Sequence, residues 1–222
     1  MIKYLLLLAS LGCLFACGNS IEIESGETKV IKLIQSEMKK PSGPAAYIDA
    51  RKIVTRAMID EANIPVLFIA IERGQNGTMT QYPGDGVGQT WLGADGSTIT
   101  LENGMLKATR GVGDDLMGSE ISRKINWTNL NTSVYFRKLA YLREDNQIHV
   151  IEYECTMRDT NRRKTIEIFD VQFLVNHLRE TCDGVASKFI NDYFVDTNGL
   201  VRKSTQYHGD IIGYVDLERL ER

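Results

Sequence analysis

The sequence predicts a mainly β protein, in which an antiparallel meander forms either a two-sheet sandwich or a partly open barrel. The first observation behind this prediction is the continuous apolar run over residues 66–71, which has the length and composition of a buried strand. The second is a series of β-prone runs separated by turn-forming residues about every ten positions. Roughly nine strands are expected, and a sheet of that size must curl or divide in two to cover its apolar face.

The clearest local signal is the dipeptide Asn103-Gly104, which accepts positive φ at both central positions of a type I′ turn. β-prone residues flank it over 98–102 and 105–109, so a tight hairpin is expected. Residues 171–182 fit a helix or a strand by periodicity, and both interpretations stay open. The remaining runs continue the meander, with turns at 144–146 and 159–161; they are 134–142, 148–157, 164–169, 193–195, 201–203 and 211–217.

Two helical segments are expected before the first strand. Apolar residues recur at helical spacing over 30–38, with charged residues on the opposite side, so an amphipathic helix should follow the N-terminal tether. Prolines and a glycine at 41–44 end it. A shorter helix is expected within 51–58.

The first 16 residues have the order of an export signal. Lys3 supplies a positive charge, an apolar run over 4–16 follows, and polar and acidic residues come soon afterwards. A helix that spans a bilayer needs about 20 apolar residues, so this run is too short to remain as an anchor. We therefore expect residues 1–16 to be removed as a signal peptide.

Cys17 is the expected site of lipid attachment. Leu14-Phe15-Ala16 places an aliphatic residue three positions before this cysteine and a small residue directly before it, which resembles the lipobox of bacterial lipoproteins. Cys13 is an alternative, although Ser10 then stands at the aliphatic position, and an ordinary secretory signal is another. Several acyl chains together anchor a protein stably, and Gly18 in place of an aspartate points to the periplasmic face of the outer membrane.

The rest of the chain would form an anchor and tether over residues 17–24 and a single β-rich domain over 25–222. The whole chain carries 26 Lys and Arg against 29 Asp and Glu, and removal of Lys3 with the signal leaves 25 against 29, a net charge of −4. There is no basic block in the sequence. This balance argues against a nucleic-acid partner.

Cys155 and Cys182 are the two cysteines that remain outside the signal and the anchor. An even pair in an oxidising compartment favours a disulfide. Cys155 shares a strand face with Ile151, Tyr153 and Met157, so it should point into the core. Two free buried thiols are the alternative. A zinc site is not expected, because the three histidines show no ligand spacing to either cysteine.

Motifs of known catalytic sites are missing from the sequence. The glycine-rich stretches at 84–88 and 111–113 lack the spacing and the following Lys-Ser/Thr of a phosphate loop, so we interpret them as turns. We assign no catalytic residue, no metal and no cofactor. A pair of opposed carboxylates, as in glycosidases, stays open because sequence does not give their separation.

Six residues are candidates for contact with a glycan or a protein partner. Exposed aromatic rings suit the faces of sugars, and an arginine beside two carboxylates offers polar groups. Each candidate has a structural alternative, since Trp and Tyr in a β domain are usually core residues and the arginine can pair with the carboxylates to fix a loop. The candidates are Trp91, Arg110, Asp114, Asp115, Trp127 and Tyr207.

Several segments, in an order and spacing that cover most of the chain after the signal, together resemble the YjbF family of lipoproteins. The stretch that contains Thr109-Arg110-Gly111 and the ending Ser204-Thr205-Gln206-Tyr207 are specific in combination. The residue before Lys203 departs slightly from the family pattern. The matching segments are 64–65, 91 with 95–96, 108–117, 153–155, 180–182, 191–196, 203–207 and 213–214.

The resemblance implies a mainly β periplasmic lipoprotein that serves capsule or exopolysaccharide secretion or assembly without catalysis. Its partners would be the lipid bilayer, through the acyl chains, and exopolysaccharide or other export proteins. Two alternatives stay open: a hydrolase or lyase that modifies polysaccharide, using a carboxylate pair or Arg110 with Asp114 and Asp115, and a structural envelope lipoprotein that binds a protein partner.

Lipidation at Cys17 gives the first testable prediction. Labelled palmitate should be attached to the wild-type protein and should be absent from the Cys17→Ala variant, because the lipobox directly precedes that cysteine. The measurement is autoradiography of the purified protein. A Cys17→Ala protein that still takes up label through Cys13 would contradict the assignment.

Overall fold

The computed structural model describes residues 49–72, 74–84, 88–130, 134–143, 147–185 and 187–221. The predicted signal peptide, Cys17 and the helix expected over 30–38 lie outside these residues. Within 51–58, where one short helix was expected, there are parts of two, α2 (Ala50–Ile53) and α3 (Arg56–Ala62). The strands of the described residues are β1 (Val66–Ile71), β2 (Asn76–Gln81), β3 (Gln89–Gly93), β4 (Thr98–Glu102), β5 (Met105–Arg110), β6 (Leu116–Ile121), β7 (Tyr135–Leu142), β8 (Ile148–Ile168), β9 (Val171–Gly184), β10 (Lys188–Asp196), β11 (Val201–Gly209) and β12 (Gly213–Arg219).

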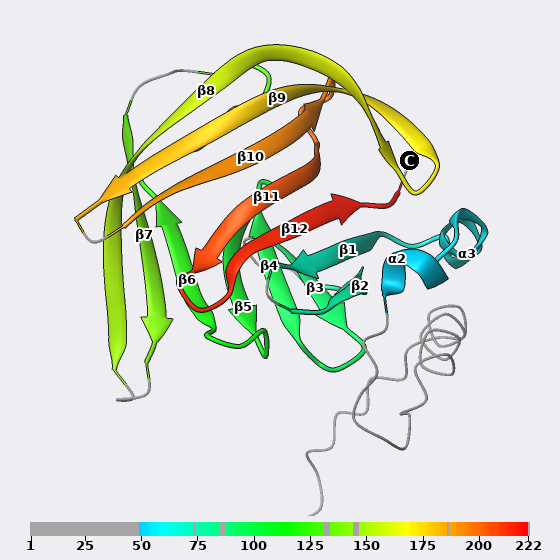
Figure 1. The fold of residues 1–222 in the computed structure, drawn as a ribbon, viewed down its shortest axis with the longest axis horizontal. Coiled ribbons are helices and arrows are strands. Elements are labelled where there is room, and N and C mark those ends of the chain that lie inside the picture. The colour runs from blue at the N-terminus through cyan, green and yellow to red at the C-terminus, as the bar shows by residue number, and fades with distance from the viewer. Residues whose placement is uncertain are drawn as a thin grey trace, which may run out of the picture.

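These twelve strands form one antiparallel sheet that curls into a nearly closed barrel (Figure 1). Almost every strand pairs with the strands before and after it in the chain. The pairing of β1 with β12 joins the first and last strands, with Leu67 opposite Arg219 and Ile71 opposite Val215. The ladder is interrupted between β5 and β6, which are the two edge strands. The partly open barrel is thus the correct form of the predicted fold, and the described residues do not form a two-sheet sandwich.

β1 shows why its sequence is apolar at every position. Leu67 and Ile69 point into the barrel and join the main core. Val66 and Phe68 point to the other side, where they pack with Ile59 of α3 in a second cluster. The tip of the long β8–β9 hairpin, which arches over the barrel in Figure 1, completes this cluster through Ile168 and Phe169. Both faces of β1 are therefore buried, and a continuous apolar run is required.

Two of the sequence expectations for the hairpins have clear outcomes. Asn103 and Gly104 have φ values of 52° and 78°, which confirms the type I′ turn. The turn expected at 159–161 is wrong, because β8 runs through these residues as one strand with a register shift between Asp159 and Arg162. A β-bulge absorbs the extra residues there, so turn-forming side chains do not reverse the chain. Residues 171–182, which were ambiguous, lie in β9.

The disulfide between Cys155 and Cys182 is confirmed, and it joins β8 to β9 across directly opposed positions. Both cysteines have no exposed surface and belong to the main core. Tyr153, on the same face of β8, packs edge-on against Phe189 of β10, with ring centroids 4.8 Å apart. The cross-link therefore lies inside the barrel wall, out of reach of solvent.

A buried ion pair lies among the apolar core residues. Arg137 of β7 donates through Nη1 to Glu180 Oε2 of β9 at 2.8 Å, and neither side chain is more than 1% exposed. The carboxylate also accepts hydrogen bonds from the hydroxyls of Tyr135 and Tyr193, at 2.7 and 3.0 Å, and from Asn191 Nδ2 at 2.6 Å. A buried charge is tolerated where it is paired and fully hydrogen-bonded, as it is here.

Burial and the Glu180 charge raise the pKa of the Tyr135 and Tyr193 hydroxyls above their usual range. Both hydroxyls therefore remain protonated and can keep donating to the carboxylate. Burial alone would lower the pKa of Arg137, but the Glu180 carboxylate beside it raises this pKa above its ordinary value. Arg137 therefore keeps its positive charge at every physiological pH.

Removal of the disulfide should reduce stability strongly. The double variant Cys155→Ala/Cys182→Ala should lose about 3 kcal/mol of free energy of unfolding, because the unfolded chain regains the entropy that the cross-link removes. Urea unfolding followed by circular dichroism measures this. The natively folded wild type should resist mild reductant because both sulfurs are buried. Equal stability of the variant and the oxidised wild type would contradict the structural role of the bridge.

Loss of the buried carboxylate should be more damaging than loss of an exposed one on the neighbouring strand. Glu180→Gln leaves the Arg137 cation without its counter-charge in the core and should cost about 3–5 kcal/mol of unfolding free energy. The matched control is Glu152→Gln, since Glu152 pairs with Lys138 at 3.3 Å on the exposed outer face. That variant should unfold at nearly the wild-type urea concentration. Similar losses of unfolding free energy in both variants would show that the buried ion pair contributes no more to stability than the exposed one.

Candidate functional site

The seam between β5 and β6 is bridged by side chains at one end. Arg110, the last residue of β5, donates through Nη1 to the Leu116 carbonyl oxygen at 3.2 Å, and through Nη2 to that of Met117 at 3.5 Å. Thr109 Oγ1 accepts a hydrogen bond from the Leu116 amide at 2.9 Å. Side chains of β5 therefore replace the missing backbone ladder next to the turn that joins the two strands.

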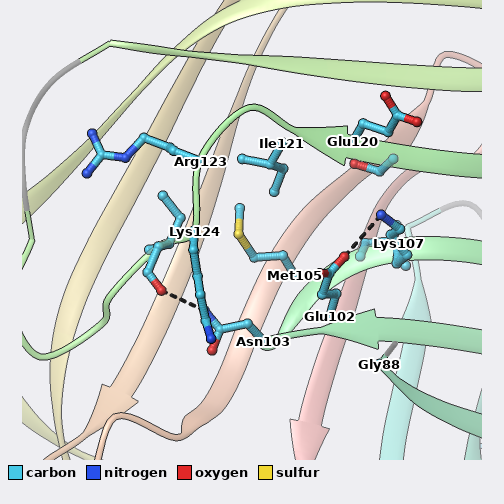
Figure 2. Close-up of a pocket in the computed structure, with 12 residues that line it drawn as sticks. Gly88, Glu102, Asn103, Met105, Lys107, Glu120, Ile121, Arg123 and Lys124 are labelled. Atoms are coloured by element: carbon cyan, nitrogen blue, oxygen red, sulfur yellow. Dashed lines mark hydrogen bonds and ion pairs between the residues drawn. The ribbon is translucent and has the colours of Figure 1, made fainter. Parts of the chain in front are cut away.

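Farther from this turn the seam opens into a cavity of about 660 Å³. The β4–β5 hairpin forms one wall, and β6 with the following residues to Ile125 forms the other (Figure 2). Asn103 Nδ2 donates to the Ile125 carbonyl oxygen at 2.8 Å, which ties the hairpin turn to the opposite wall. Met105 projects into the space between the walls, near Ile121. The cleft is thus a direct result of the open ladder.

The rim of the cleft carries both signs of charge. Lys107 and Glu102 form an ion pair at 3.0 Å on the β4–β5 side, and Arg123 and Lys124 lie on the other side, away from this pair (Figure 2). Glu120 is the other carboxylate that lines the cleft. Mixed charges, an asparagine and a few apolar side chains suit a polar ligand such as a sugar chain or a peptide.

The buried ion pair holds the floor of this cleft. Leu106 and Ser119 line it from β5 and β6, and Arg137 donates to both, to the Leu106 carbonyl oxygen at 3.1 Å and to Ser119 Oγ at 3.2 Å. Gln206 of β11 accepts from the Leu106 amide at 2.7 Å and donates to the Gly104 carbonyl oxygen at 2.9 Å. The backbone of β5 is therefore fixed from inside the barrel.

The predicted charged contacts turn out to hold the β5–β6 turn and its surroundings. Asp115 accepts from the amides of Gly111 and Val112 at 2.8 and 3.1 Å. Asp114 pairs with Arg143 at 3.0 Å. The expected pairing of Arg110 with these carboxylates is wrong, because its guanidinium donates to backbone carbonyl groups. All three candidates thus have structural partners, and the glycines at 111 and 113 adopt the positive φ expected of turns.

The aromatic candidates divide by burial. Trp91 is completely buried and Trp127 is 7% exposed, with its indole N–H bonded to the Asn103 carbonyl oxygen at 2.8 Å. Neither ring presents a face to a ligand, so both are core residues and the suggestion of sugar contact is corrected for them. Tyr207 is half-buried and stacks on Phe189 with ring centroids 4.6 Å apart. The six candidates therefore do not form one site.

Sequence reasoning missed the polar residues inside the barrel. His208 has no exposed surface, its Nε2 lies 2.9 Å from Thr109 Oγ1, and its Nδ1 has no hydrogen-bond partner. Burial lowers the pKa of His208, although Asp114 and Asp115 oppose this effect. Arg137, Glu180 and Gln206 were not identified from the sequence either. Strict alternation on β9 and β11 places Glu180 and Gln206 on the inward face, and that was the available clue.

Groups of potential metal ligands are scarce. In the described residues one such group occurs, formed by Cys155, Glu180 and Cys182, but the two sulfur atoms are joined to each other in the disulfide and offer no thiolate. The helices in the same part of the chain are too short and too polar for any of them to cross a bilayer.

A search of the solved structures finds a similar fold in the crystal structure of the hypothetical lipoprotein YmcC from Escherichia coli (K12). The two chains are 17% identical, with a TM-score of 0.71, and the match covers 90% of this chain and 97% of the other. Such a likeness establishes the fold. Curated proteins give no match to this sequence.

A family model matches residues 31–220, and its description is "Group 4 capsule polysaccharide lipoprotein gfcB, YjbF". The match includes every helix and strand described above and all of the residues that line the cleft. It agrees with the resemblance found in the sequence segments and with the likeness of the fold to another lipoprotein. The chain belongs to the YjbF family of lipoproteins.

Proposed function

We propose that this protein is a lipid-anchored accessory factor in the secretion or assembly of capsule or exopolysaccharide, and that it acts by binding and not by catalysis. The observation that carries the proposal is the family match over residues 31–220, whose description names a capsule polysaccharide lipoprotein. The lipobox at Cys17 supports an anchor in the outer membrane, with the barrel on the periplasmic side.

The structure supports a binding role through the state of its acidic groups. Along the seam, Glu102 is paired with Lys107, Asp114 with Arg143, and Asp115 holds backbone amides of the β5–β6 turn. Among the carboxylates that line the cleft, Glu120 is the one without an ion pair in the described residues, and a glycosidase needs two carboxylates. A general acid or base must be able to reach a substrate with a suitable proton affinity. Carboxylates already engaged in fixed bonds are better suited to shape a surface than to transfer protons.

The seam cleft is the proposed contact for a polymer or for another export protein. Its walls are the β4–β5 hairpin and β6 with the residues that follow it, and no backbone ladder joins β5 to β6, so a ligand can bind between them without breaking the sheet. Its floor is held by Arg137 and Gln206, so the cleft keeps its shape when empty. A preformed site of this kind binds with a small ordering cost.

Deletion of the gene tests the proposal in the cell that carries it. Surface polysaccharide, measured by uronic-acid assay or by antiserum, should fall on deletion and return when the wild-type gene is supplied in trans. The Cys17→Ala gene should restore less surface polysaccharide than the wild-type gene, because the barrel would no longer be held at the membrane. Unchanged surface polysaccharide in the deletion strain would count decisively against the proposal.

A second arm of the same experiment separates binding from catalysis. The purified full-length protein is incubated with the polymer of its own cell, and reducing ends and unsaturated sugars are measured. We expect neither product to form above the level of a heat-inactivated sample. Product formation that is lost in Asp114→Asn or Asp115→Asn would instead assign the protein as a hydrolase or lyase.

A further inference from the structure

An exposed row of cations lies on the outer face of the long β8–β9 hairpin, away from the seam cleft. In β9, Val175, His177 and Arg179 alternate along one face of the strand. Their partners across the ladder are Lys164, Arg162 and Arg158 of β8, and opposed residues share a face of the sheet. Four cationic side chains therefore face outward together. We name this set, Arg158, Arg162, Lys164 and Arg179, the basic strip.

The basic strip has few acidic neighbours to neutralise it. All four side chains are exposed. Asp192 of β10 lies beside them, but it is already bound by Arg179 Nε at 2.9 Å and by His177 Nε2 at 2.7 Å. Burial alone would raise the pKa of Asp192, yet the bonds from Arg179 and His177 lower it, so this carboxylate stays ionised and engaged.

The other three cations of the strip lack such a partner. Within the residues that the structure describes, Arg158, Arg162 and Lys164 make no ion pair within 4.0 Å. The ammonium group of Lys164 lies over the Phe194 ring, 4.5 Å from its centroid. His177 stacks on the same ring, with centroids 4.8 Å apart. Lys164 is thus positioned by an aromatic ring and remains available to an anion.

The register of the β8–β9 ladder places two like charges opposite each other, which lowers the stability of the fold. Arg158 stands directly opposite Arg179 on an exposed face. Like charges in directly opposed positions of an antiparallel ladder are destabilising. Asp192 offsets the charge of Arg179, so Arg158 is the arginine of this pair that has no counter-charge. Its guanidinium group can bind a carboxylate or a phosphate through paired hydrogen bonds.

We propose that the basic strip binds an anionic polysaccharide through the carboxylate or phosphate groups of its repeating units. This inference rests on the proposed function and names the chemical class of the polymer. Alternate residues of a strand lie about 6.6 Å apart on one face, so an extended polymer can meet several of these cations in succession. The chain has a net charge of −3, so it has no overall attraction to such a polymer, and binding needs a local cluster of cations such as the strip.

Binding of polygalacturonate, which has one carboxylate on each sugar, provides the test. Full-length wild-type protein in non-ionic micelles should bind this polymer more tightly than neutral dextran, and added salt should weaken the binding. The variant Arg158→Gln/Arg162→Gln/Lys164→Gln should bind about tenfold more weakly, since three exposed charge contacts are each worth a fraction of a kcal/mol. Its melting temperature should equal or exceed that of the wild type, because the repulsion between Arg158 and Arg179 is gone.

The matched control removes three cations elsewhere on the surface. The variant Lys52→Gln/Lys138→Gln/Lys188→Gln has the same net charge as the strip variant, and its dissociation constant should stay within about twofold of the wild-type value. Equal weakening in both variants, or unchanged binding in the strip variant, would overturn the inference. Displacement of the polymer by micelles doped with phosphatidylglycerol, at equal concentration of negative charge, would assign the strip to lipid and overturn it as well.

The binding assay and the deletion assay test different claims, so either claim can be refuted without the other. If deletion lowers surface polysaccharide but binding of polygalacturonate does not depend on the strip, the proposed function stands. The inference that the basic strip binds the polymer is then wrong. If deletion leaves surface polysaccharide unchanged, the proposed function fails, whatever the strip binds in the purified protein.

Discussion

The free edge of β5 is the constraint on which the rest of this structure depends. An edge strand presents a row of backbone groups with no partner strand, and such edges invite pairing with other chains. Here the Leu106 amide and carbonyl groups and the Gly104 carbonyl group are bound by Gln206 and Arg137, which reach across the barrel from β11 and β7. Side chains complete the ladder that the backbone leaves open.

This solution requires charged and polar groups in the core. Arg137 can be buried because Glu180 balances its charge, and Glu180 can be buried because Tyr135, Tyr193 and Asn191 saturate its oxygens. Removal of any one member leaves another buried polar group without a partner. The network is therefore cooperative, and it fixes the distance between β5 and the opposite wall.

The same constraint links the fold to the proposed function. Because the seam is closed by side chains from inside, a cleft of about 660 Å³ remains open on the outside. The basic strip lies on a different surface, on the outer face of the hairpin that arches over the barrel. A protein with two polar surfaces on one rigid barrel is suited to hold a polymer on one surface while it contacts a second partner through the other.

Local signals in the sequence predicted most of the strands but not the pairing that closes the sheet into a barrel. Asn103-Gly104 defined a hairpin because only a few residues accept positive φ, and the run at 66–71 defined a buried strand. β2, β3 and β6 were missed, because glycines and polar residues weaken their alternation. The bulge at 159–161 resembled a turn, since both use Asp, Thr and Asn. Pairing of β1 with β12 depends on contacts between distant residues, which local patterns do not contain.

The candidate site was harder to predict than the fold for a physical reason. Arg110, Asp114 and Asp115 were identified by their residue types, and the structure uses them to hold the seam. The residues that shape the cleft floor, Arg137 and Gln206, lie on strands that are far from β5 in the sequence. A buried arginine gives the same local pattern as an exposed one until its partner across the barrel is known.

Amide hydrogen exchange at Leu106 tests the central claim most directly. This amide lies on an edge strand, where exchange is normally fast, but its hydrogen bond to Gln206 should make it exchange as slowly as the amides of interior strands. In a Gln206→Met variant that remains folded, the Leu106 amide should exchange much faster while those of β10 and β12 stay protected. Fast exchange at Leu106 in the wild type would show that side chains do not close the seam.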